Sequence, residues 1–264
     1  MKRILTLLAA SALLSGCGGK KENELKISGG TAHLKVMNVV AKKFRETHPD
    51  VNITISGGGS GVGIKQVGEG MVDIGNSGRD LKESEISKYG LVPHAIAIDA
   101  ISVIVNPSSK INKLTSEQVQ KIYSGAVSNW KALGGTDAKI NVYTRDSESG
   151  TRSTFWKLAL KKGKITNSAM IVKSNGDMKV NIARDKFGIG FMSVGNMDKS
   201  VKAVAVDGIL PTVENIKSGK YRIQRKLYSV TKGEPKGIVK EFIDLLTSDY
   251  GQKVVQEHKF IPVK

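Results

Sequence analysis

The stretch that begins at Arg145 and ends at Arg152 is rich in groups that bind anions. The two arginines each carry a guanidinium, and Ser149 and Thr151 offer hydroxyl groups on either side of Gly150. A guanidinium can donate two parallel hydrogen bonds to an oxyanion, and a glycine lets the backbone approach a ligand closely. These residue types therefore predict an anion-binding loop. The alternative is an ordinary serine or threonine helix cap flanked by two solvated arginines.

The elements around this loop suit the same chemistry. A short β-prone run, 140–144, precedes Arg145, and a helical pattern, 153–160, follows the loop. The first turn of a helix leaves backbone N–H groups without intrahelical partners and carries partial positive charge. A loop between a strand and a helix is therefore a favourable place for an anion.

Two earlier loops repeat this arrangement of strand, loop and helix. The run 25–29 enters a glycine-rich turn before a helical pattern at 34–46, and the alternating run 51–56 breaks into the glycine-rich segment 56–63 before another helix at 61–69. One glycine-rich loop is usually only a turn. Three of them brought together would surround a small anion with N–H and O–H donors, so the prediction depends on their repetition.

Several short motifs, taken in order, resemble the phosphate-binding protein of the bacterial ABC-type phosphate uptake system. They lie at 30–31, 60–63, 72–79, 114–135, and 145 with 149–152. The resemblance runs from about residue 25 to the C-terminus. It implies an α/β, two-lobed periplasmic binding protein type 2 fold with a hinge of two crossing segments. It also implies capture of inorganic phosphate between the lobes and delivery to the permease subunits of an ABC transporter.

The resemblance implies a set of phosphate-binding residues: Thr31, Ala32, Ser60, Ser77, Gly78, Arg79, Arg145, Ser149, Gly150 and Thr151. It implies no catalytic residue, metal or cofactor. The sequence departs from the family at Gly78, because some members carry an aspartate in this loop that accepts the proton of phosphate. We therefore expect an acceptor from Asp73, Asp146 or Glu148, and a preference for phosphate over sulfate of more than about a hundredfold.

The N-terminal residues are typical of an export signal. Lys2 and Arg3 precede an apolar run, 4–14, that is too short to span a bilayer, and small residues follow it. The single cysteine, Cys17, then occupies a lipoprotein processing site. We expect a signal peptide at 1–16, a lipid such as palmitate on Cys17 and a tether over 17–24. The alternative is an ordinary secretory signal with an incidental cysteine.

The alternation of strands and helices predicts a largely parallel sheet with ligands at the carboxyl ends of its strands. The first lobe is expected to comprise 25–98 and 210–264, and the second 99–209. The apolar runs 95–106 and 201–209 are the expected hinge crossings, and one C-terminal helix, 238–257, is expected to complete the first lobe.

Composition and the remaining motifs leave three other functions to consider. The formal net charge of +17 suits a polyanion binder, but the lysines are dispersed and only 5% of residues are aromatic, which disfavours nucleic acid as a partner. A binder of sulfate or molybdate would use the same donors as a phosphate binder. A phosphoester hydrolase would need a base, and the histidines lie in no recognisable motif; we expect His33 to be exposed. The favoured interpretation is a monomeric, extracytoplasmic, lipid-anchored phosphate binder at the periplasm or cell surface.

Overall fold

The computed structural model describes residues 23–264. The predicted signal peptide and Cys17 lie outside the described residues, as does the predicted tether up to residue 22. Glu24, placed at the end of that tether, is already the first residue of a strand. Among the helices of the described part, none is long and apolar enough to cross a membrane.

The first lobe is built on parallel strands, as the alternating pattern predicts. Its sheet contains β1 (Glu24–Gly29), β2 (Asn52–Gly58), β3 (Ile74–Ser77) and β11 (Gln224–Lys232). β1 lies between β2 and β3 and is parallel to both, whereas β11 is antiparallel to β3. The helices of this lobe are α1 (Leu34–Thr47), α2 (Ser60–Gly68), α3 (Glu83–Tyr89), α8 (Gly237–Thr247) and α9 (Asp249–Glu257).

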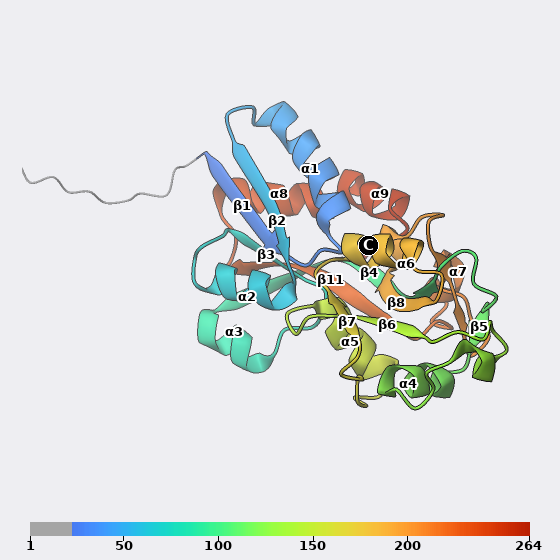
Figure 1. Cartoon of the computed structure of the whole chain (residues 1–264). Helices are drawn as coiled ribbons and strands as arrows, with labels where there is room; N and C mark the ends of the chain where they lie inside the picture. Colours follow the sequence, from blue (N-terminus) through green and yellow to red (C-terminus); the bar gives the residue numbers. More distant parts are fainter. Residues whose placement is uncertain (1–22) are drawn as a thin grey trace, which may run out of the picture.

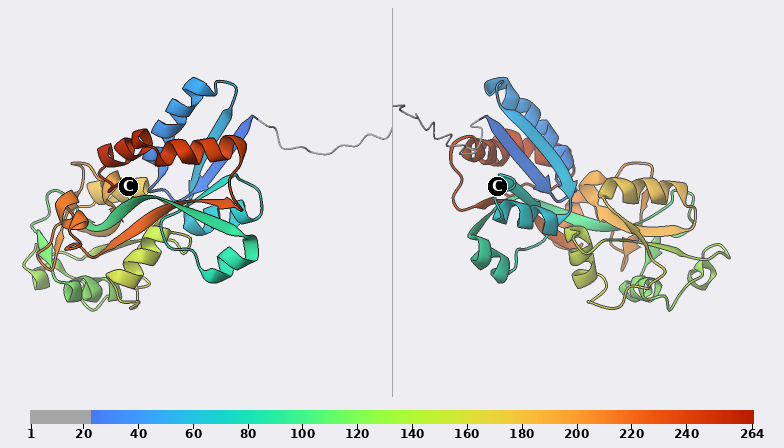
Figure 2. Two further views of the ribbon diagram at one scale, coloured as in Figure 1. Left: turned by 180° about the vertical axis from the view of Figure 1, so that it is seen from behind. Right: turned by 60° about the vertical axis from the view of Figure 1, so that its left-hand side comes forward.

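The apolar face of α1 explains how this lobe closes. Val36, Met37, Val40 and Phe44 recur at helical spacing and are buried. They join one hydrophobic cluster with Leu25 and other residues of β1, and with residues of α8 and α9. Figures 1 and 2 show α1, α8 and α9 together on one side of this sheet. This packing fixes the end of β1 from which the first glycine-rich turn emerges.

The second lobe has its own strands and its own core. Its main elements are α4 (Ser116–Ser124), β6 (Asn141–Arg145), α5 (Gly150–Leu158), β7 (Met170–Val172), α6 (Asn175–Arg184) and β8 (Gly188–Ser193). Its smaller elements are β5 (Lys113–Leu114), β9 (Lys202–Ala203), β10 (Ala205–Val206), α7 (Val213–Lys217) and the 3-10 helices Trp130–Leu133 and Val194–Asn196.

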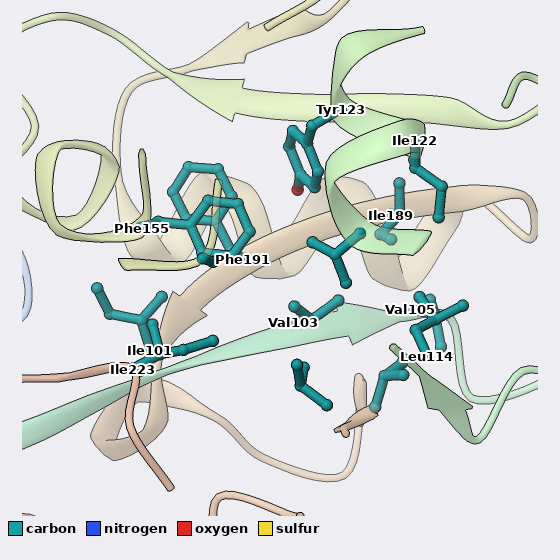
Figure 3. Close-up of a cluster of buried hydrophobic side chains, with 14 of the residues drawn as sticks. Ile101, Val103, Val105, Leu114, Ile122, Tyr123, Phe155, Ile189, Phe191 and Ile223 are labelled. Carbon is teal, nitrogen blue, oxygen red and sulfur yellow. The ribbon is translucent and has the colours of Figure 1, made fainter. Parts of the chain in front are cut away.

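Aromatic rings fill the centre of the second core. Phe155 of α5 stacks on Phe191 of β8 with ring centroids 4.1 Å apart, and Tyr123 of α4 approaches the Phe155 ring edge-on at 5.1 Å (Figure 3). Stacked and edge-on aromatic pairs add stability beyond the area that they bury. The packing of Phe155 therefore anchors α5, whose first residues belong to the predicted anion loop.

A single long strand joins the two lobes. β4 (Leu91–Val105) pairs with β11 through its residues 91–100 and with β8 through its residues 101–105. The sheet order is β2-β1-β3-β11-β4-β8-β6-β7, so β4 belongs to both lobes. Figure 1 shows β4 and β11 side by side between the two groups of elements. β4 contains most of the predicted crossing 95–106.

The return to the first lobe differs from the expectation. Ile216, Tyr221 and Ile223 are buried in the core of the second lobe, and the chain joins the sheet of the first lobe only at Gln224. The run 201–209 forms the short strands β9 and β10 instead. It then turns through Asp207 and Gly208, both at positive φ. The start of β11 is therefore the second crossing, and the proposed boundary at 209 and 210 moves toward residue 223.

The predicted C-terminal helix is two helices. Ser248, between α8 and α9, has extended backbone angles, and its Oγ accepts a hydrogen bond from the N–H of Gly251 at 3.3 Å. A serine cap of this kind starts a new helix and interrupts the old one. The apolar residues Phe242, Leu246, Val254 and Val255 still lie in the core of the first lobe.

Candidate anion-binding site

The three predicted loops meet where the lobes face each other. Ser60 is the first residue of α2, and Gly150 is the first residue of α5. A β-carbon built on Gly150 would collide with Ser60 Oγ, and the N–H of Gly61 donates to the carbonyl oxygen of Glu148 at 3.0 Å. Helix starts from opposite lobes are therefore in direct contact. A side chain at position 150 would prevent this approach.

Arg145 is the buried cation of the site. It ends β6 and is only 2% exposed. Its Nε donates to the carbonyl oxygen of Val172 at 3.1 Å, and its Nη2 donates to that of Lys173 at 2.8 Å, while its buried Nη1 has no protein partner. Burial lowers the pKa of the guanidinium to about 10, so it remains charged at neutral pH. Two backbone contacts thus hold a full positive charge that still has hydrogen-bond donors to offer.

Thr31 meets a residue of the other lobe that sequence reasoning missed. Its Oγ1 accepts hydrogen bonds from the N–H of Asn175 at 3.3 Å and from Asn175 Nδ2 at 3.1 Å, and both residues are buried. Asn175 begins α6, where Ser174 Oγ accepts a hydrogen bond from the N–H of Asp177. A serine followed three residues later by an acidic residue signals a helix start. The sequence could therefore have located α6, but not its contact with Thr31.

Gly78 lies at a junction of hydrogen bonds. Its N–H donates to Ser60 Oγ at 2.9 Å. Its carbonyl oxygen accepts from Thr154 Oγ1 at 3.4 Å and from Arg225 Nη1 at 2.8 Å. Thr154 and Arg225 are further contacts that the sequence did not predict, because they come from α5 and β11. The loop after β3 is thus fixed by both lobes.

Three more predicted residues lie in buried positions around these contacts. Ser149 caps α5 by accepting a hydrogen bond from the N–H of Arg152 at 3.1 Å, as the helix-cap alternative expected, but Arg145 is buried and not solvated as that alternative required. Thr151 is 5% exposed in the first turn of α5. Ala32 is buried, and its carbonyl oxygen accepts from Asn196 Nδ2 at 3.2 Å.

Ser77 and Arg79 differ from the rest of the predicted set. Ser77 is buried, but its hydroxyl donates to the carbonyl oxygen of Arg79 at 2.8 Å. The Arg79 guanidinium makes a two-pronged ion pair with Glu85 of α3 at 2.9 Å and 2.7 Å. The side chain of Arg79 therefore points to α3, where the Glu85 carboxylate balances its charge.

The predicted acceptor carboxylates lie in three different settings. Asp73 directly precedes β3 and accepts a hydrogen bond from the N–H of Lys26 in β1. It therefore lies at the opposite end of β3 from Ser77. Asp146 is partly exposed and accepts from the N–H of Glu148 at 3.0 Å, and Glu148 itself is exposed. Only Asp146 combines partial burial with a position next to Arg145. Its role as an acceptor stays a prediction.

His33 is buried, so the expectation that it would be exposed is wrong. It directly precedes α1 and is 0% exposed, with Nδ1 3.0 Å from the carbonyl oxygen of Gly30. Burial lowers the pKa of its imidazole to about 3, with a smaller contribution from the charge of Arg225. The neutral ring supports the turn that carries Thr31. In the described part, no three histidine, cysteine or acidic residues form a group that could hold a metal ion.

Comparisons with known proteins agree on one family. Residues 18–250 match the family model described as a PBP superfamily domain. The chain is 36% identical to the phosphate-binding protein PstS of Bacillus subtilis (strain 168), over 99% of this chain and 94% of that protein. It is 32% identical to PstS of Borreliella burgdorferi, with complete coverage of both chains.

Solved structures are similar in fold as well as in sequence. One is a putative phosphate ABC transporter substrate-binding protein with bound phosphate from Clostridium perfringens. It is 37% identical with a TM-score of 0.87, over 92% of this chain and all of that one. Another is an ABC-type phosphate transport receptor from Vibrio cholerae, 34% identical with a TM-score of 0.73, over 90% of this chain and 99% of that one.

Proposed function

Because the chain belongs to the PBP superfamily and, within it, to the PstS phosphate-binding proteins, we propose that it captures inorganic phosphate between its lobes for an ABC transporter. The motifs of the chain and the names of its relatives agree on this assignment. The two-lobed type 2 fold provides the facing surfaces that such capture requires.

The observation that carries this proposal is the buried guanidinium of Arg145. Its Nη1 has no protein partner although it is fully enclosed, and an unpaired buried donor is costly. An oxyanion would accept from it and from the N–H groups at the starts of α1, α2 and α5. The hydroxyl groups of Thr31, Ser60 and Thr151 would complete the set. A small tetrahedral anion can accept hydrogen bonds from many donors that lie this close together.

The proposed transport cycle follows from contacts between the lobes. Asn175 with Thr31, and Glu148 with Gly61, join the lobes around the site. Opening at the two crossings, β4 and the start of β11, would separate these pairs and expose the anion. We propose that the open form gives phosphate to the permease subunits, and that the protein works as a monomer tethered by its N-terminal lipid outside the cytoplasmic membrane.

A binding role without catalysis is part of the proposal. A hydrolase of this kind would need a serine nucleophile paired with a histidine base. Here the Ser149 hydroxyl accepts from the N–H of Arg152, and the His33 ring lies against the Gly30 carbonyl oxygen, so Ser149 and His33 do not form such a pair. A chromogenic phosphate ester should therefore remain intact in the presence of the protein. Release of its product, proportional to protein concentration, would contradict a purely binding role.

Calorimetric titration with phosphate tests the central claim. We expect one saturable site per chain in protein that has first been freed of phosphate by partial unfolding and dialysis. Molybdate and a long polyphosphate, titrated separately, test the other oxyanion and the polyanion alternatives. Absence of heat with phosphate, together with saturable binding of either other ligand, would refute the assignment.

A further inference from the structure

Asp99 and Arg225 form a buried ion pair at the junction of the lobes. They lie directly opposite each other on β4 and β11. The carboxylate and the guanidinium are 0% and 4% exposed, and Arg225 donates from Nε at 3.0 Å and from Nη2 at 2.8 Å to Asp99 Oδ2. A buried ion pair often adds no net stability compared with apolar residues. The position of its charges therefore explains this pair better than stability does.

Arg225 reaches the phosphate site through Gly78. Its Nη1 donates to the Gly78 carbonyl oxygen at 2.8 Å. A β-carbon built on Gly78 would lie only 2.7 Å from the same nitrogen. The guanidinium thus fills the space that a side chain at position 78 would enter, next to the peptide whose N–H bonds to Ser60. A positive group stands at this corner of the site.

The carboxylate of Asp99 is already committed. Its Oδ2 receives both Arg225 nitrogens, and its Oδ1 accepts from Ser193 Oγ at 2.9 Å. The other buried acid of the described part, Asp73, lies at the far end of β3. Neither buried acid is placed to accept a proton from an anion held by Arg145.

We propose that Arg225 is a second cationic residue of the phosphate site and that, together with Arg145, it makes the site select the doubly charged form of phosphate. This inference rests on the proposed function and names the species that is bound. Asp99 balances the Arg225 charge on the side of Nε and Nη2, whereas Nη1 faces Gly78, and the charge of Arg225 is felt at Arg145. Positive charge from two guanidiniums at one site attracts a dianion more strongly than a monoanion. The monoanion also brings another O–H donor to a site in which donors predominate, and a donor without an acceptor is penalised.

The consequence for solution behaviour is a dependence on pH. Affinity for total phosphate should rise as the second ionisation of phosphate proceeds and then level off. The ionisable groups around the two guanidiniums are His33, Asp99, Asp146 and Asp177. Sulfate is also a dianion and has no proton at neutral pH. The preference for phosphate over sulfate should therefore fall well short of the ~10⁴-fold reached where a required hydrogen bond is lost.

The experiment compares calorimetric phosphate affinity at pH values on both sides of that ionisation. The main variant is Asp99→Asn with Arg225→Gln, because it removes both members of the ion pair and leaves the net charge unchanged. We expect phosphate affinity at least tenfold weaker than wild type and a flatter pH profile. Lys226→Gln, an exposed neighbour on β11, is the control and should match wild type. Arg225→Lys should keep the wild-type pH profile with a smaller loss of affinity.

The outcomes distinguish failure to bind phosphate from the absence of a role for Arg225. A wild type that binds no phosphate at any pH overturns the proposed function itself. A wild type that binds phosphate, with a folded double variant of equal affinity and equal pH profile, leaves Arg225 a structural role and overturns only this inference. If the double variant does not fold, phosphate affinity that does not change with pH in the wild type or in Arg225→Lys overturns this inference. So does ~10⁴-fold rejection of sulfate that Asp146→Asn relaxes, because Asp146 would then be the acceptor.

Discussion

At the scale of single residues, Arg145 makes two contacts within the protein and has one donor group left for the proposed anion. Its Nε and Nη2 hold the carbonyl oxygens of Val172 and Lys173, and its Nη1 is available to an anion. The two contacts orient the guanidinium before any ligand arrives. A group fixed in advance loses little conformational entropy on binding.

Replacing Arg145 by alanine should therefore weaken phosphate binding at least tenfold. Losing one partner of a desolvated charge pair costs about 2–5 kcal/mol. Because two buried carbonyl oxygens also lose their donor, some loss of thermal stability without ligand is expected. Titration calorimetry and thermal melting measure the two effects. Arg222→Ala, an exposed arginine just before β11, is the control, and wild-type affinity in Arg145→Ala would exclude the proposed role.

Residue types and spacing predicted the loops that make up much of the candidate site. The strand–loop–helix pattern located the loops of Thr31, Ser60 and Arg145. It could not reveal Asn175, Thr154 or Arg225, because these come from elements that only the tertiary fold brings together. It could not reveal the ion pair of Arg79 with Glu85 for a related reason, because Glu85 comes from α3.

At the scale of elements, the start of α1 contains a buried ionisable group. His33 Nδ1 lies 3.0 Å from the carbonyl oxygen of Gly30, which belongs to the first glycine-rich turn. Burial lowers the pKa of the imidazole from 6.5 to about 3. The unfolded chain takes up a proton below pH 6.5, whereas the folded chain does not. Stability supported by neutral His33 is therefore complete above pH 6.5 and declines as pH falls toward 3.

This linkage predicts how the free energy of unfolding changes with pH. Between pH 6.5 and about pH 5, His33 alone should lower it by about 2 kcal/mol, at about 1.4 kcal/mol per pH unit. His33→Gln should lose that portion of the pH dependence, even if the variant is less stable overall. Urea unfolding without phosphate, at several pH values, measures both proteins. Parallel pH profiles for the two would contradict the assignment.

Element boundaries show where local sequence gives incomplete information. Apolar spacing predicted a continuous helix over 238–257, but the Ser248 cap divides it, and the local signal is a serine followed by an acidic residue. The second crossing was misplaced because short apolar runs such as 201–209 do not specify which core receives them. Only packing of Ile216 and Tyr221 in the second core decides that.

At the scale of the whole molecule, the lobes touch through polar groups around the site. Asn196 reaches the carbonyl oxygen of Ala32 at 3.2 Å, and Lys35 Nζ reaches that of Gly195 at 3.3 Å, beside the contacts of Thr31 and Gly61. Polar contacts of this kind exchange for water at modest cost. Each hydrophobic core is formed mostly by residues of its own lobe, although Ile261, near the C-terminus, packs in the core of the second lobe. The lobes can therefore separate with little exposure of either core.

The position of the first strand bears on how the whole protein is held. β1 begins at Glu24 in the middle of the first-lobe sheet, between β2 and β3. A lipid on Cys17 would thus be joined by a short polar segment to the start of β1, at the end of this strand opposite from Gly29 and the first glycine-rich turn.

Cys17→Ser should abolish incorporation of a radioactive fatty acid and leave the export signal uncleaved or the protein unlipidated. Phosphate affinity of the folded domain should be unchanged, because the site lies in the part that begins at residue 23. Metabolic labelling and membrane fractionation of cells that produce either form measure the first effect, and calorimetry measures the second. Undiminished labelling of Cys17→Ser would show that the anchor lies elsewhere.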